Sequence, residues 1–100
     1  MEELKFTKEL VDITLDKLGT SVTFECQLSK EGQKVEWFKD NKKLLPDIEY
    51  SMEVDGKTYR LVIKKAAASD VGTYKAECLS LSTAAKLKIQ GRVVLLFKLY

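Results

Sequence analysis

The chain of 100 residues lacks features on which several classes of protein depend. It has no histidine, so the commonest general base of enzyme sites is missing. No apolar run approaches the ~18 residues of a membrane-spanning helix, and no basic start with an apolar block marks a secretion signal. The only asparagine, Asn41, precedes two lysines and is not a glycosylation acceptor. We therefore expect a cytoplasmic protein that is not an enzyme and has no membrane partner.

Neither a large charge excess nor a rich set of metal ligands is present. The 17 basic and 15 acidic side chains leave a net charge of +2, whereas nucleic-acid binding calls for a strong basic excess on one face. The two cysteines, Cys26 and Cys78, are too few and too far apart for a zinc site. We expect no nucleic-acid partner, no metal and no cofactor.

What the sequence does contain is alternation of apolar and polar residues in short segments, the period of two that is typical of half-buried strands. In "SVTFECQL" (21–28), every second residue from Val22 to Leu28 is apolar. Six further segments show the pattern: "LVDITL" (10–15), "KVEWFK" (34–39), "YSMEV" (50–54), "TYRLVIK" (58–64), "GTYKAEC" (72–78) and "AAKLKI" (84–89). In these segments the pattern predicts that the following residues face the core: Val11, Ile13, Leu15, Val35, Trp37, Tyr50, Met52, Val54, Tyr59, Leu61, Ile63, Tyr74, Ala76, Cys78, Ala85, Leu87 and Ile89.

Turn signals separate these segments, at 16–20, 29–33, 39–42, 46–47, 55–57 and 69–72. The segment "KKAAASD" (64–70) has room for only one helical turn. Seven or eight short strands with frequent turns predict an antiparallel sandwich or barrel.

At these positions the chain resembles the immunoglobulin fold, specifically its intermediate set. Cys26 stands where the family has its first core cysteine, and Trp37 follows eleven residues later, at the place of the core tryptophan. Leu61 fits the fifth strand of that pattern. The resemblance covers about residues 4 to 90 and implies an all-β, antiparallel β-sandwich of seven to eight strands in two sheets.

The motif D-x-G-x-Y of the same family is matched by Asp70, Gly72 and Tyr74. The resemblance implies that the Tyr74 hydroxyl braces the corner before the sixth strand. "VEWFKDNKKL" and "YSMEVDGKTYRLVIKKA" are similar to domains of the giant muscle proteins, the group of titin, obscurin and twitchin, and among these first to titin.

The chain departs from the family pattern at Ala76, which replaces the second core cysteine. In the implied fold Cys26 faces Ala76, while Cys78 lies two residues, or roughly 7 Å, further along its strand. Added to the gap between the two sheets, that offset places the two Cα atoms beyond the ~7 Å that an unstrained disulfide allows. We expect two free, mostly buried thiols, and a core that depends on packing around Trp37.

A second departure is the end of the chain, where "GRVVLLFKLY" (91–100) is apolar and matches nothing expected after the last strand. We assign residues 1–91 to an immunoglobulin-like domain and 92–100 to an apolar C-terminal tail. The tail could extend the last strand or pack onto the sandwich, dock a partner, or be a non-native or alternative terminus.

Other readings of single features are open at this point. Cys26 could be a nucleophile rather than a core thiol, and with Cys78 it could form a redox switch. The small basic clusters "KDNKKL" and "IKK" could dock an acidic partner, although the neighbouring acids favour a solvated face.

The resemblance implies a non-enzymatic structural and protein-interaction module, one of a series in a sarcomeric scaffold or elastic protein such as titin. Its partners would be neighbouring immunoglobulin-like domains and other sarcomeric proteins, in the cytoplasm of the myofibril. The strand around 11–15 would then pair in parallel with the last strand around 86–89. The alternatives are an extracellular adhesion or receptor domain, and a targeting domain attached to a muscle kinase.

Overall fold

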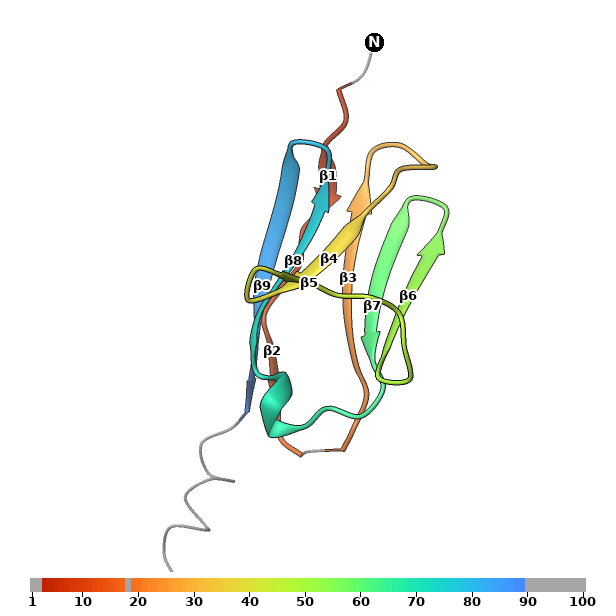
Figure 1. Cartoon of the computed structure of the whole chain (residues 1–100). Helices are drawn as coiled ribbons and strands as arrows, with labels where there is room; N and C mark the ends of the chain where they lie inside the picture. The colour runs from red at the N-terminus through yellow and green to blue at the C-terminus, as the bar shows by residue number, and fades with distance from the viewer. Residues whose placement is uncertain (1–2, 18, 90–100) are drawn as a thin grey trace, which may run out of the picture.

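Two β-sheets packed face to face make up the molecule, as the computed structural model shows for residues 3–17 and 19–89 (Figure 1). The all-β sandwich predicted from the sequence is confirmed, with nine strands among the described residues rather than seven or eight. In chain order the elements are β1 (Phe6–Lys8), β2 (Ile13–Leu15), β3 (Val22–Leu28), β4 (Glu36–Lys39), β5 (Lys42–Lys43), β6 (Tyr50–Asp55), β7 (Thr58–Ile63), the 3-10 helix η1 (Ala68–Asp70), β8 (Gly72–Cys78) and β9 (Leu81–Ile89).

The first sheet has the strand order β1-β3-β7-β6 and the second the order β2-β9-β8-β4-β5. All neighbours are antiparallel except β2 and β9, which run in parallel. The N-terminal segment thus contributes one strand to each sheet. The start of the described chain and the end of β9 lie at opposite ends of the sandwich (Figure 1).

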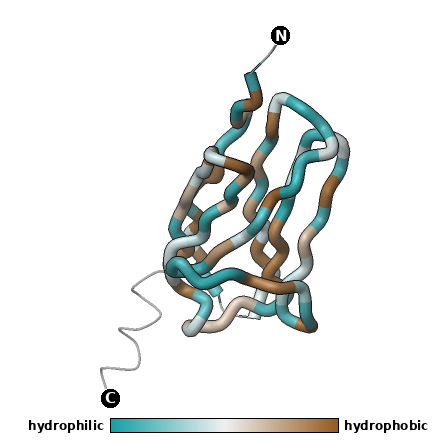
Figure 2. Tube along the Cα trace, turned by 45° about the horizontal axis from the view of Figure 1, so that its top comes forward, coloured by the Kyte–Doolittle hydropathy of each residue, from teal (hydrophilic) through white to brown (hydrophobic). Residues whose placement is uncertain are grey.

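The core lies between the sheets and is built from the alternating residues. Along β3, β7 and β8 every second side chain is buried, as the sequence pattern predicts. Figure 2 shows the corresponding change between apolar and polar residues along the strands. The buried apolar residues are Leu10, Leu15, Val22, Phe24, Cys26, Leu28, Trp37, Tyr59, Leu61, Ile63, Ala66, Tyr74, Ala76, Cys78, Ala85 and Leu87.

Two residues expected in the core are exposed instead. Val11 is 68% exposed, because the chain crosses from the first sheet to the second before Ile13 and inserts Leu10 into the core. Val54 is 65% exposed, because it lies near the end of an edge strand, beside the turn that follows Asp55. The alternation was therefore wrong at these two positions.

Strand β1 was not predicted as a separate strand. It is three residues long, and its register with β3 shifts between Phe6 and Lys8. A strand this short, with a bulge and one large apolar residue, leaves no period-two pattern in the sequence.

The predicted turns at 39–42 and 55–57 form tight hairpins. Asp40 and Asn41 both have positive φ, 49° and 70°, between β4 and β5. Aspartate and asparagine tolerate this conformation better than most residues, so the pair suits a two-residue hairpin turn. Gly56 has φ 61° in the turn between β6 and β7.

The corner before β8 is built around Asp70 and Tyr74. The buried Tyr74 hydroxyl donates to the Asp70 carbonyl oxygen at 2.5 Å, and burial raises the pKa of this hydroxyl. Asp70 Oδ2 accepts from the Ala67 amide at 2.8 Å across the single turn of η1. The Tyr50 hydroxyl reaches Asp70 Oδ1 at 3.3 Å. The corner is therefore held by hydrogen bonds to both the backbone and the side chain of Asp70.

The substitution Tyr74→Phe removes the buried hydrogen bond, so the Asp70 carbonyl oxygen loses the donor that the hydroxyl supplies. We expect a loss of about 1–3 kcal/mol in the free energy of unfolding, measured by urea denaturation. Tyr50→Phe is the matched control, because it removes a longer bond from a half-buried hydroxyl. An equal loss for both variants would contradict a special role of the Tyr74 hydroxyl.

Candidate functional site

The residues singled out from the sequence lie in the core and at its corner. Cys26, Trp37, Leu61, Asp70, Tyr74, Ala76 and Cys78 are all buried, and Gly72 is half-buried. Trp37 on β4 is the register partner of Ala76 on β8, so the alanine lies beside the core tryptophan. These residues place the strands and offer no reactive group to the surface.

Gly72 is explained by the close approach of a neighbouring carboxylate. A Cβ atom at this position would lie 2.7 Å from Asp40 Oδ2. The carboxylate is held there, because Asp40 Oδ1 accepts from the Thr73 amide at 3.0 Å. The glycine of the motif thus lets the hairpin between β4 and β5 dock onto the start of β8.

Both thiols, Cys26 and Cys78, are free and buried. Burial, followed by the charge of Glu25 and the neighbouring Cys78, raises the pKa of Cys26 to about 11. Burial also raises the pKa of Cys78. Because the thiolate is the reactive form of cysteine, both side chains are poor nucleophiles near neutral pH.

We expect both thiols to react with Ellman's reagent only after unfolding. Native protein without reductant, at pH 8, should show almost no fast reaction, and two thiols per chain should appear in guanidinium. An intact disulfide under the same conditions would contradict this expectation and favour the extracellular alternative.

The parallel pairing between β2 and β9 links segments near the two ends of the described chain. Its register is Ile13↔Leu87, Thr14↔Lys88 and Leu15↔Ile89, which confirms the parallel pairing that the resemblance implied. The two-residue turn between Cys78 and Leu81 places the backbone groups of 82, 84, 86 and 88 on the side of β9 that faces β2. By the same alternation Ile13 and Leu15 present their backbone groups to β9.

Two side chains continue this pairing beyond the strand. Asp12 Oδ1 accepts from the Lys86 amide at 2.8 Å, one position before the first register pair. Further back, the Leu10 amide donates to the buried Thr83 hydroxyl at 3.2 Å. We call residues 10–15 together with 83–89 the terminal clamp. The sequence reasoning missed Asp12 and Thr83, since neither role leaves a periodic signal.

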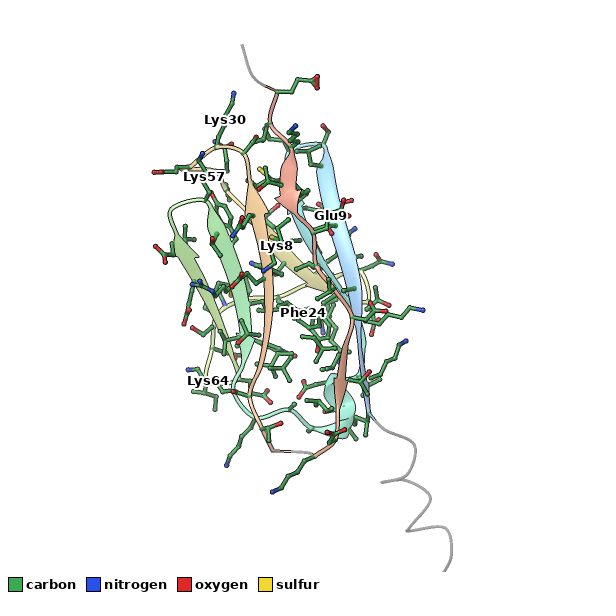
Figure 3. The ribbon with its side chains drawn as sticks, turned by 180° about the vertical axis from the view of Figure 1, so that it is seen from behind. Lys8, Glu9, Phe24, Lys30, Lys57 and Lys64 are labelled. Carbon is green, nitrogen blue, oxygen red and sulfur yellow. The ribbon has the colours of Figure 1, made fainter. Side chains whose placement is uncertain are left out.

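An ion-pair group crosses the outer face of the first sheet. Glu25 on β3 binds Lys8 Nζ of β1 and Arg60 Nε of β7, each at 2.8 Å. Figure 3 shows Lys8 beside β3 on this face. Hydrogen bonds from Lys8 and then Arg60 hold the pKa of Glu25 below its usual value. These pairs tie three strands together at the surface.

Glu25→Gln should lower the free energy of unfolding by about 0.5–1 kcal/mol at pH 7. Since the folded pKa of Glu25 is lowered, its contribution is complete above the unfolded value of about 4.5 and is lost as the pH falls below it. The difference between variant and parent should therefore shrink between about pH 5 and pH 3, measured by urea denaturation. Glu31→Gln, in an exposed loop, is the control and should leave the profile unchanged.

The described residues hold little else that could support chemistry. Over 3–17 and 19–89, no three His, Cys, Asp or Glu side chains gather as a metal-binding group. In the same ranges no helix has the length and apolar character needed to cross a bilayer. A hollow of about 580 Å³ near the N-terminal end is lined by Glu3, Lys5, Thr7, Leu28, Ser29 and Lys57.

Comparison with known proteins finds relatives in myosin-binding protein C and titin. Cardiac-type myosin-binding protein C of Mus musculus is 33% identical over 88 residues, which cover 86% of this chain and 7% of that protein. Titin of Drosophila melanogaster is 32% identical over 90 residues, 90% of this chain and 0%, to the nearest percent, of that protein. The chain therefore spans only a small part of the relatives it matches.

Solved structures agree with the architecture. Domain I10 from titin superimposes with a TM-score of 0.83 at 24% identity, covering 89% of this chain and 100% of that one. The family model described as the immunoglobulin I-set domain matches residues 4–90. With the sandwich, the core tryptophan and the tyrosine corner in place, the chain belongs to the immunoglobulin I-set family.

Proposed function

We propose that this chain is a non-catalytic structural and protein-interaction module, one of a series in a sarcomeric scaffold or elastic protein. Its similarity to titin and to cardiac myosin-binding protein C supports this setting. The small share of each relative that the chain spans fits one domain of a longer series. We place the module in the cytoplasm of the myofibril, where free, buried thiols are stable.

The partners that we propose are neighbouring immunoglobulin-like domains and other sarcomeric proteins. The two ends of the described sandwich lie at opposite poles, so neighbours could attach in line without covering either sheet (Figure 1). Residues 1–91 would form the folded unit. The tail, 92–100, lies outside the described residues.

The observation that carries the mechanical part of the proposal is the terminal clamp. A pull on the N-terminal segment draws β2 toward one pole, and a pull on the C-terminal end draws β9 toward the other. Because the two strands are parallel neighbours, this load acts along the strands and stresses their hydrogen bonds together. Strand β1 meets the load first, but its pairing with β3 is short and shifted in register.

Weakening the terminal clamp should lower the unfolding force more than an equally destabilising change elsewhere in the domain. Proline at position 13 has no amide hydrogen to donate to β9. We expect Ile13→Pro to lower the unfolding force in single-molecule stretching more than an equally destabilising change in "YSMEV" (50–54), such as Met52→Ala. Chemical denaturation sets the match in stability. Equal losses of force in the two variants would argue against the clamp as the load-bearing element.

A further inference from the structure

Strand β6 is the longest edge strand of the described sandwich, and it lies at the outside of its sheet in both Figure 1 and Figure 3. The Lys64 amide donates to the Glu49 carbonyl at 3.0 Å, in the same register that pairs Tyr50 with Ile63. Residues 49, 51, 53 and 55 therefore bond to β7, and the backbone groups of 50, 52 and 54 point away from it.

One of these three outward positions is already occupied. Asp47 donates its amide to the Tyr50 carbonyl at 3.0 Å, and Asp47 Oδ1 accepts from the Tyr50 amide at 2.9 Å. Met52 and Val54 have no such backbone partner within the described residues. The free edge is thus a two-residue site, which we call the β6 edge, with two amide donors and two carbonyl acceptors in a row.

An apolar groove adjoins the β6 edge. Met52 lines a hollow of about 230 Å³ together with Trp37, Leu44 and Leu45. Leu45 is 66% exposed, and Val54 extends the apolar strip along the strand. Lys34 and a charged pair, Lys43 and Glu36 at 2.7 Å, also line the hollow. An apolar side chain that entered from the edge would contact Met52, Trp37 and the two leucines and leave the ion pair intact.

The other face of the same strand carries two acids, Glu53 and Asp55, and Arg60, the register partner of Glu53 on β7, is paired with Glu25. The segment 47–55, "DIEYSMEVD", contains four acids and no base, in a chain whose net charge is +2. All four acids are exposed, and none is in an ion pair within the described residues. Strand alternation sets Glu53 and Asp55 on the face opposite Met52 and Val54.

We propose that the β6 edge binds an extended protein segment in which basic and apolar residues alternate. The segment adds to the sheet as a further strand and bonds to the backbone of Met52 and Val54. Its apolar residue faces the groove beside Met52, and its flanking basic residues lie next to Glu53 and Asp55. This inference deepens the docking part of the proposed function by naming the surface and the chemistry of the partner.

A second copy of this chain does not fit the same edge. Two β6 strands side by side would bring Glu53 and Asp55 of one chain against the same acids of the other. Like charges on neighbouring strands are destabilising, and charged edges commonly prevent such self-pairing. The charge pattern therefore selects a basic partner over a copy of the domain.

A short synthetic peptide, acetyl-KVKVK-amide, tests the proposal by amide NMR titration of the 100-residue chain. We expect shift changes concentrated at residues 51–55 and slower hydrogen exchange of the Met52 and Val54 amides. Glu53→Lys should weaken binding about fivefold or more, whereas Glu31→Lys, an equal change of charge in a distant loop, should not. The charge-reversed peptide acetyl-EVEVE-amide should bind at least about fivefold more weakly.

Val54→Pro tests the backbone contact itself. Proline removes an outward amide hydrogen without removing a bond to β7, so the fold should persist by circular dichroism. Binding should be lost in this variant and kept in Val54→Thr, which retains the amide and the branched side chain. The proposal would be overturned if Val54→Pro and Val54→Thr bound the peptide equally, or if Glu53→Lys and Glu31→Lys lost equal affinity. Peptide-induced shifts remote from β6, or concentration-dependent shifts without peptide, would also overturn it. The stretching result for Ile13→Pro is independent of this outcome.

Discussion

The stacked rings of Phe24 and Tyr74 join the two sheets, with their centroids 4.9 Å apart and their planes at 29°. Phe24 comes from β3 and Tyr74 from β8, so the contact spans the interface between the sheets. The cysteines form no covalent link there, and the layers are held together chiefly by packing. Since Tyr74 also bonds to Asp70, the same side chain positions the corner and thereby the strand on which β9 depends.

The parts of the fold that could be predicted are those in which a strand is covered on one face only. In β3, β7 and β8 burial of one face imposes alternation, and the pattern alone identified the inward residues. The pattern failed where cover is incomplete. Val11 lies where the chain changes sheets, and Val54 lies at an uncovered edge, so neither hydrophobicity nor spacing reported its exposure.

The surface features could be predicted less well, because they depend on register. The parallel neighbours β2 and β9 followed from the resemblance, but the contribution of Asp12 depends on which amides of β9 face β2. The acidic run at 47–55 is visible in the sequence, whereas the free backbone groups of Met52 and Val54 follow only from the bond between Lys64 and Glu49. A one-residue shift of that register would turn them toward β7.

The two hydrogen bonds between Asp47 and Tyr50 have a consequence for selectivity. By closing one end of the edge, Asp47 leaves only Met52 and Val54 open, so it would limit the length of strand that can add there. A long aggregation-prone segment would gain no more backbone hydrogen bonds at this edge than a short one, so the edge does not favour further growth of the sheet. A single aspartate would thus limit the length of the segment that can pair with the edge.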